Sequence, residues 1–331
     1  MRKNTPEKIS DAYLAVENKV VETTQYQSAK NAINSMMLFE NVRSVGMMLL
    51  AETGLGKSTV LDKFVTNNLS KITENVIASV DYKFTPVPIL MFEMPEQPSI
   101  KSVCEAILTA ADHPDLSGTA TALTRRVDKL IEHQLVRYLI IDECQHLLRE
   151  HAGKRTTDAL NFIKNRMNKH KIIVIVSGVP NAEKALTEYA ELSERLSYKK
   201  CYMTEFEINT EEERDNFGAF LLSFDNLFNE IELNICQLYS TDMLEPLFLA
   251  CCGSPRKFKY LLFKVLEQAI GSSAKITKKS FATAYKDEQY NDLLGVFNPF
   301  SASAEKVDAK LLEWNKFKIK KHLEQTKKKR R

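Results

Sequence analysis

The sequence has no apolar run approaching the roughly 20 residues that a helix needs to cross a bilayer. Its first ten residues, MRKNTPEKIS, are polar and lack the hydrophobic stretch of a secretory signal. Six cysteines are present but none forms a CxxC pair, and the six histidines are scattered. These absences predict a cytoplasmic protein with reduced thiols, without a membrane partner and without a metal cage built from side chains alone.

Charge is spread unevenly over the 331 residues. The whole chain carries a net charge of only +3, but residues 301–331 hold eleven Lys or Arg against four Asp or Glu, which leaves −4 on the first 300. This asymmetry indicates a basic tail on a mildly acidic body. Because Asn298-Pro299-Phe300 separates the two, the tail is interpreted as an interaction arm, with a disordered solubilising segment as the alternative.

Short apolar runs alternate with helical patterns up to about Thr210. The runs are expected to form strands at residues 45–50, 87–94, 138–141, 172–176 and 200–203. Continuous apolar strands that alternate with helices predict an α/β fold in which helices cover both faces of a parallel sheet. From Glu211 onward only helical periodicity is found. We therefore expect a helical extension over residues 1–40, an α/β core over 41–210, a smaller all-helical lid over 211–298 and the basic tail over 299–331.

The first expected strand runs into the sequence AETGLGKS at residues 51–58. The P-loop pattern requires Gly, four residues and then Gly-Lys-Ser/Thr, so Ala51 departs from it at the first position. In such a loop the backbone N–H groups and the N-terminus of the next helix attract phosphate. A chance Gly-Lys-Ser is the alternative, but the flanking strand and helix favour a P-loop. The residues expected to bind nucleotide are Glu52, Thr53, Gly54, Leu55, Gly56, Lys57, Ser58 and Thr59.

The run at 138–141 ends in Asp142-Glu143, about 85 residues after the P-loop. P-loop ATPases place such a pair beside the nucleotide, where the aspartate holds Mg²⁺ and the glutamate polarises the attacking water. An exposed acidic pair at a strand end is the alternative, and the presence of the P-loop disfavours it. We expect an ATPase that takes ATP and Mg²⁺, with Ser58 and Asp142 as metal ligands and Glu143 as a catalytic residue.

Three further residues complete the expected catalytic set. Ser177 follows the run at 172–176, in position to orient water near the γ-phosphate, unless it merely ends a strand. Arg256, within Gly-Ser-Pro-Arg, resembles the arginine that reaches the γ-phosphate from the lid of AAA+ ATPases. Arg195 precedes the last strand and resembles the arginine finger that an AAA+ subunit supplies to its neighbour's site. An ordinary surface arginine is the alternative for Arg195.

The order of these motifs resembles the TniB/TnsC family of AAA+ transposition regulators found in Tn7-like elements. The similarity covers roughly residues 23–195 and, more loosely, the lid to about residue 270. Its more specific marks are Glu-x-Pro after the second run and Gly-x-Pro-x-Ala after residue 177. The resemblance implies a bacterial, cytoplasmic ATPase that forms homo-oligomeric rings or filaments on target DNA and links target-site selection to the transposase. It also implies transposase subunits and a TniQ-type target-selection protein as partners.

Subunits that encircle double-stranded DNA must present basic residues that meet phosphates without reading sequence. The candidates are Lys101, Lys154, Arg155 and Lys164, each with a solvated surface charge as the alternative. The basic tail is a further candidate for contact with DNA or with the transposase.

Two other functions stay open on the sequence alone. One is an AAA+ ATPase that loads a helicase or starts replication, although no DNA-reading domain such as a helix-turn-helix is recognisable. The other is a nucleotide-locked scaffold that binds DNA and scarcely hydrolyses ATP. Because Glu143 is present, hydrolysis is favoured.

Overall fold

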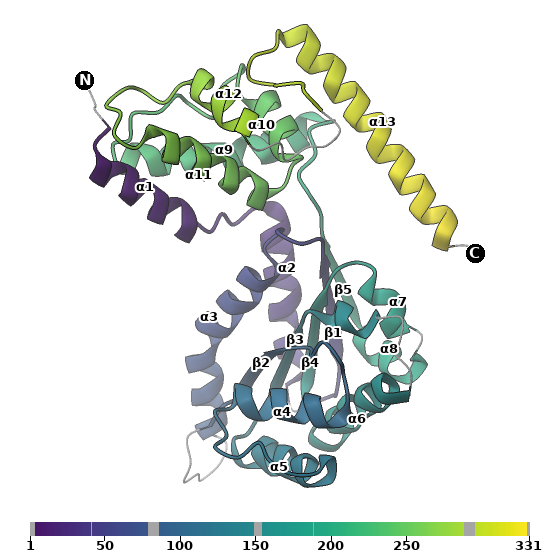
Figure 1. The fold of residues 1–331 in the computed structure, drawn as a ribbon. Coiled ribbons are helices and arrows are strands. Elements are labelled where there is room, and N and C mark those ends of the chain that lie inside the picture. The colour runs from purple at the N-terminus through teal and green to yellow at the C-terminus, as the bar shows by residue number, and fades with distance from the viewer. Residues whose placement is uncertain are drawn as a thin grey trace. The chain divides into compact units, whose positions relative to one another are not determined.

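The computed structural model describes residues 4–40, 42–78, 86–148, 154–187, 189–287 and 295–329. The chain forms two compact units (Figure 1). The α/β unit comprises Thr24–Thr204, and the helical unit comprises Met1–Thr23 with Glu205–Arg331. Within the described residues, no helix is both long enough and apolar enough to span a membrane.

A five-stranded sheet forms the centre of the α/β unit. Its strands are β1 (Gly46–Ala51), β2 (Ile89–Glu93), β3 (Tyr138–Asp142), β4 (Ile173–Gly178) and β5 (Lys199–Met203). They lie in the order β2-β3-β4-β1-β5, and every neighbouring pair is parallel. All residues of β1, β3 and β4 are buried, as their continuous apolar sequences require. The order leaves β4 between the strand that precedes the P-loop and the strand that ends in the acidic pair.

Helices pack on both faces of this sheet. The elements of the unit are α2 (Thr24–Ser35), α3 (Lys57–Ala78), α4 (Ile100–Ala110), α5 (Ala120–His133), α6 (Lys154–His170), α7 (Ala182–Thr187) and α8 (Ala190–Leu196), with 3₁₀ turns at Met36–Phe39 and Cys144–Leu148. Alternate strand residues such as Met48 and Val176 share one apolar cluster with α4, α5, α6 and α8. On the opposite face Phe64 of α3 meets Tyr138 of β3, ring to ring at 5.8 Å. This arrangement confirms the predicted α/β fold with a covered parallel sheet.

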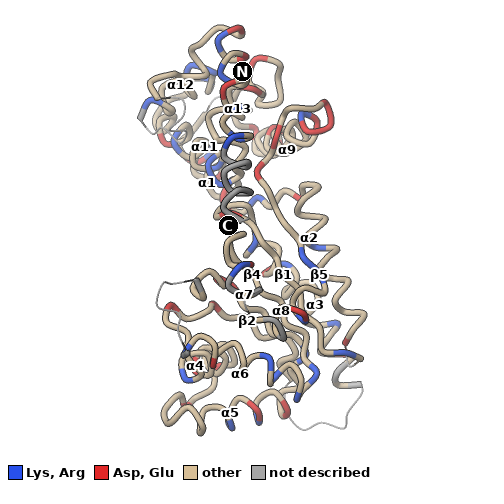
Figure 2. The backbone as a smooth tube through the Cα atoms, turned by 90° about the vertical axis from the view of Figure 1, so that its right-hand side faces the viewer, with Lys and Arg blue, Asp and Glu red and all other residues tan. Residues whose placement is uncertain are grey.

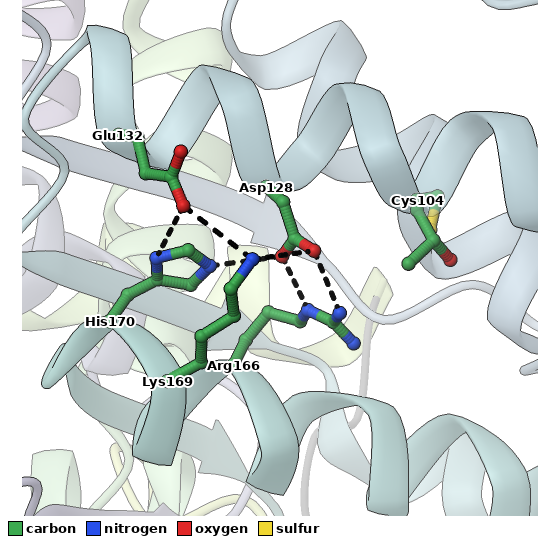
Figure 3. A network of polar contacts seen from close by, with 7 residues as sticks. Cys104, Asp128, Glu132, Arg166, Lys169 and His170 are labelled. Atoms are coloured by element: carbon green, nitrogen blue, oxygen red, sulfur yellow. Dashed lines mark hydrogen bonds and ion pairs between the residues drawn. The ribbon is translucent and has the colours of Figure 1, made fainter.

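A network of charged side chains joins α5 to α6 (Figure 3). The carboxylate of Asp128 accepts hydrogen bonds from Arg166 at 2.7 and 3.0 Å and from Nε2 of His170 at 2.9 Å, and Lys169 lies 3.1 Å away. Burial disfavours ionisation of Asp128, but these donors outweigh it and hold the pKa of the carboxyl well below its ordinary value. Nearby on α4, burial raises the pKa of the Cys104 thiol to about 11.

The helical unit is built around phenylalanine side chains. It comprises α1 (Pro6–Asn18), α9 (Glu211–Glu230), α10 (Leu244–Cys251), α11 (Pro255–Ala269), α12 (Lys278–Asp287) and α13 (Ala304–Lys329). Phe220 and Phe224 of α9 each contact Phe258 of α11, with ring centroids 5.1 and 5.0 Å apart. A capping box between Thr210 and Glu213 fixes the start of α9.

Helices α1 and α13 join the core of the helical unit, whereas the sequence predicted separate segments for residues 1–40 and 299–331. In α1 the residues Ile9, Ala12 and Val16 form a buried stripe with helical spacing, and α2 belongs to the other unit. In α13 the buried stripe is Val307, Leu311 and Trp314. The apolar stripes explain the difference, because each must be covered by other apolar side chains. Side chains from residue 321 onward, including the basic end, lie outside the described part.

Candidate nucleotide site

The P-loop links β1 to α3 by a tight turn. Ala51 is the last residue of β1 and Lys57 is the first of α3. Gly54 and Gly56 have positive φ values of 88° and 91°, which residues with a Cβ rarely adopt. The departure from the P-loop pattern at Ala51 therefore falls on ordinary strand backbone. The loop presents the N-terminus of a 22-residue helix, whose exposed N–H groups and dipole attract phosphate.

The ammonium group of Lys57 lies inside this loop and is nearly buried. Its Nζ donates to the carbonyl oxygens of Ala51 at 2.6 Å and Glu52 at 3.2 Å. These bonds hold the positive charge at the mouth of the loop, where a phosphate oxygen would compete with the carbonyl groups. Glu52, Thr53 and Ser58 are exposed, and Gly54 and Thr59 are half-buried. Leu55 is buried and anchors the turn.

The structure brings the acidic pair against the start of α3. Ser58 Oγ donates to Asp142 Oδ2 at 2.9 Å, and the other carboxylate oxygen of Asp142 accepts from the backbone N–H of Glu143 at 2.8 Å. Asp142 itself is buried. The serine hydroxyl and the carboxylate are hard oxygen ligands of the kind that Mg²⁺ prefers. Among the described residues no cluster of three His, Cys, Asp or Glu side chains could hold a metal, so phosphate and water would have to complete its shell.

Glu143 is held in an unusual backbone conformation. Its φ is +57°, a left-handed value that is uncommon for a residue other than glycine. The Glu143 carboxylate accepts a hydrogen bond from Nε2 of Gln145, and Oε1 of Gln145 accepts from the backbone N–H of Val179 at 3.3 Å. Gln145 therefore ties the carboxylate to the segment that follows β4. Left-handed strain of this kind is found often at functional sites.

Ser177 lies near the carboxyl end of β4, between the P-loop strand and the acidic-pair strand. It is paired with Leu49 of β1 and its side chain is 0% exposed. Its hydroxyl has no hydrogen-bond partner among the described residues. A buried hydroxyl without a hydrogen-bond partner destabilises the folded protein, so packing alone does not explain a serine at position 177.

Sequence reasoning missed two residues of this site. Gln145 is one, and a hydrogen-bonding side chain two residues after the acidic pair was the available signal. The other is Asp62, one helical turn after Ser58. Partial burial and the nearby charge of Asp142 raise the pKa of Asp62. Its spacing of four residues from Ser58 on the same helix predicts this proximity.

The two expected arginines lie on α8 and α11, and their expected roles stay predictions. Arg195 is half-buried on α8 and lines a cavity with Arg43 and Lys164 at the amino ends of the strands, opposite the P-loop edge. Gly46 allows α8 to approach this closely, because a Cβ there would lie 2.6 Å from Leu196 and 2.7 Å from the carbonyl oxygen of Val174. Arg256 is the second residue of α11 in the helical unit, and its expected contact with the γ-phosphate stays a prediction.

The residues predicted to contact DNA lie on two helices, α4 and α6. Lys101 is exposed on α4 and lies 3.7 Å from Glu105. Arg155 is exposed at the start of α6, and Lys164 is about 13 Å further along the helix axis. Lys154 begins α6, and its side chain lies outside the described part. Lys and Arg are interleaved with Asp and Glu along both units (Figure 2), so their contact with DNA stays a prediction.

Comparisons with known proteins concern the family and the fold. A family model described as "TniB: Bacterial TniB protein" matches residues 15–205. The ORC2 protein of Aeropyrum pernix, solved in ADPNP–ADP complexes, has a similar fold with a TM-score of 0.56 and 13% identity, over 82% of this chain and 70% of that one. CDC6P from Pyrobaculum aerophilum has a TM-score of 0.58 and 11% identity, over 89% of this chain and 75% of that one. A search of curated proteins found no match.

A third similar structure is Drosophila ORC bound to DNA, with a TM-score of 0.55 and 10% identity, over 84% of this chain and 65% of that one. At such identities the likeness concerns the fold alone. It confirms the predicted AAA+ type of P-loop fold, with its parallel sheet and its helical region after the sheet.

Proposed function

This chain belongs to the TniB family, and on that premise we propose that it is an ATP-hydrolysing regulator of DNA transposition that assembles on target DNA. The observation that carries the enzymatic part is the 2.9 Å hydrogen bond between Ser58 and Asp142. It supports a site in which the P-loop and a catalytic carboxylate pair act on one nucleotide. The family match supports the role in transposition.

In this proposal the start of α3 binds the phosphates of ATP. The loop N–H groups and the Lys57 ammonium group neutralise the phosphate charge, and Ser58 with Asp142 holds Mg²⁺. ATP with Mg²⁺ supplies the phosphoryl group and a charge that stabilises its transfer. Glu143 orients and polarises the attacking water, and Gln145 keeps the Glu143 carboxylate in place.

The proposed biological role depends on the assembly of several subunits on DNA. Subunits form a ring or filament around double-stranded DNA and meet its phosphates without reading sequence. Arg195 acts in the neighbouring subunit's site, which is consistent with its position at the strand edge opposite its own P-loop. Transposase subunits and a TniQ-type protein are the proposed partners. The basic end of α13 is a candidate for contact with DNA or transposase.

A replication task is the second candidate function, because the fold resembles those of ORC and CDC6P proteins. The two are separated by function in a reconstituted reaction. A transposition regulator increases strand transfer by its transposase into target DNA in the presence of ATP. A helicase loader or initiator has no effect on strand transfer and instead promotes helicase loading or origin opening.

Phosphate release measured with and without duplex DNA tests the enzymatic part. We expect Lys57→Ala to lose ATP binding. Glu143→Gln should bind ATP and assemble, with turnover lower by a factor of roughly 10² to 10⁴, the usual contribution of a general base. Normal turnover by Glu143→Gln contradicts the assignment of Glu143. Binding without turnover by the unaltered protein favours the nucleotide-locked scaffold.

Electron micrographs with duplex DNA and a slowly hydrolysed ATP analogue test the assembly part. Ordered rings or filaments on the DNA are the expected result. Isolated monomers under conditions where the analogue binds contradict the proposal.

A further inference from the structure

The chain passes between its two units twice, and the second passage lies between Thr204 and Glu205. The residues that follow it, 205–207, belong to the helical unit and are called here the crossing segment. The ring of Phe206 packs against two phenylalanine rings of α9, with centroids 5.3 and 5.0 Å apart. Glu205 and Glu207 flank this ring and are half-buried. The crossing segment therefore holds two carboxylates beside an aromatic anchor.

Helix α13 brings one lysine to these two carboxylates. Lys318 donates a hydrogen bond to Glu205, and its ammonium nitrogen lies 3.7 Å from a carboxylate oxygen of Glu207. Lys318 follows the buried Trp314 by one helical turn, and its ammonium group lies 5.4 Å from the centre of that ring. The packing of the buried stripe of α13 therefore determines where the lysine lies.

The crossing segment depends on this lysine electrostatically. Partial burial raises the pKa of the Glu207 carboxyl, the charge of Lys318 opposes this rise, and the charges of Glu213 and Glu205 add to it. Without the lysine, the carboxylates of Glu205 and Glu207 would repel each other. We therefore expect the crossing segment to lose its fixed path when the charge of Lys318 is removed.

The backbone of the crossing segment is joined to the turn that precedes α11. The N–H group of Phe206 donates to the carbonyl oxygen of Gly253 at 2.9 Å. The two backbones approach so closely that a Cβ on Gly253 would lie 2.2 Å from the carbonyl oxygen of Phe206. Arg256 follows Gly253 by three residues, as the second residue of α11. A shift of Phe206 must therefore move the start of the helix that carries Arg256.

The first passage of the chain is joined to the same helix. It lies between Thr23 and Thr24, shortly after α1. Near the end of α1, the carbonyl oxygen of Glu17 accepts a hydrogen bond from Nζ of Lys259 at 2.8 Å. Lys259 lies on α11 less than one helical turn after Arg256. Contacts with both passages therefore determine where α11 begins, and α13 acts on the second of them.

We propose that Lys318 is a positioning residue for the nucleotide site, which holds the crossing segment against Gly253 and so places Arg256 for contact with the γ-phosphate. The inference rests on the proposed function, in which that phosphate is bound and cleaved. It gives a role in hydrolysis to a helix that the sequence indicated to be part of a basic tail. Lys318 acts from a distance, through the backbone of the crossing segment, and touches no nucleotide.

Removing the charge of Lys318 tests this role. We expect Lys318→Met to lower phosphate release about fivefold and the preference for an ATP analogue over ADP about threefold, because only the analogue carries a γ-phosphate. Arg256→Ala should lower the same two quantities, and adding Lys318→Met to it should change neither by more than about twofold. Multiplied losses in the double variant overturn the proposal, as does a Lys318→Met protein with unaltered rate and preference.

Two further variants separate the charge of Lys318 from general effects on α13. The exchange variant Lys318→Glu/Glu205→Lys keeps one cation beside two carboxylates and should recover most of the loss. Lys310→Met is the matched control, because it removes a lysine of α13 that pairs at 2.6 Å with Glu313 of the same helix, and it should change neither quantity. An exchange variant as defective as Lys318→Met contradicts the role of these ion pairs.

Hydrogen exchange distinguishes failure of this inference from failure of the proposed function. Without nucleotide, Lys318→Met should speed exchange of residues 205–210 about tenfold and leave the middle of α9 unchanged. Unchanged exchange of this segment contradicts the proposal even where the rate falls. If the unaltered protein releases no phosphate, the proposed hydrolysis fails, and nucleotide preference together with exchange decides the inference. Should Lys318→Met not fold, Glu205→Gln replaces it and should change the same quantities in the same direction.

Discussion

Ser58 donates a hydrogen bond to Asp142 over 2.9 Å, although 84 residues separate them in the sequence. The contact joins the first turn of α3 to the end of β3. The strand that leads into α3 is β1, and it lies two strand positions from β3 in the sheet. The contact is short because parallel strands bring their carboxyl ends to the same edge of the sheet. The phosphate-binding loop and the acidic pair therefore meet at one place.

We predict that Gln145→Leu lowers phosphate release about tenfold while ATP binding is unchanged, because the Glu143 carboxylate loses the donor that orients it. Single-turnover phosphate release and equilibrium ATP binding are the measurements. The double variant Gln145→Leu/Glu143→Gln provides the control, since a residue that acts through Glu143 should add little once Glu143 is altered. Additive losses would mean that Gln145 contributes independently of Glu143.

Much of this site could be predicted from the sequence, for a clear physical reason. A P-loop and an acidic strand end are local patterns, and the rule that parallel strands end at one edge places them together. The family and the AAA+ fold followed from those patterns and are confirmed. Gln145 and Asp62 were not predicted, because a single polar residue has no pattern of its own and its role depends on what the fold brings beside it.

The assignment of the chain ends depended on packing that the sequence does not reveal. Ile9, Ala12 and Val16 are far from α11 in sequence, and a stripe of three apolar residues in a polar segment does not specify what covers it. Trp314 and Leu311 were interpreted as part of a basic tail because charge dominates the composition there. Burial against the helical unit became visible only in the fold.

Asp128 should make stability depend on pH. Its folded-state pKa is lowered, so its stabilising effect is full above the pKa of the unfolded chain, about 3.9, and is lost progressively as pH falls from that value through the lower folded-state pKa. Asp128→Asn should lower the unfolding free energy by about 2 to 4 kcal/mol at pH 7, since it leaves Arg166 without its carboxylate in a mostly buried position. Urea unfolding of both proteins between pH 7 and 3 checks this. A difference that stays constant over that range contradicts the role of the carboxylate charge.

Gly253 should tolerate no side chain. Its φ is +70°, and a Cβ there would lie 2.2 Å from the carbonyl oxygen of Phe206, a backbone atom that cannot turn away. Gly271 is the matched control, because its φ is +77° but a Cβ would meet nothing within 4 Å. We expect Gly271→Ala to cost about 1 kcal/mol of unfolding free energy from backbone strain and Gly253→Ala about 3 kcal/mol or more. Equal costs in thermal or urea unfolding would show that the contact with Phe206 is unimportant.

Ser177→Ala should raise stability and lower activity together. The hydroxyl of Ser177 is fully buried without a partner among the described residues, so its removal should raise the unfolding free energy by about 1 kcal/mol. If the hydroxyl orients water between the P-loop and Glu143, phosphate release should fall at least several-fold while ATP binding is kept. Urea unfolding and single-turnover kinetics measure the two effects on the same protein. If Ser177 merely ends a strand, Ser177→Ala should raise stability without lowering the rate of phosphate release. A loss of rate together with a gain in stability would instead show that the hydroxyl serves function at a cost to folding.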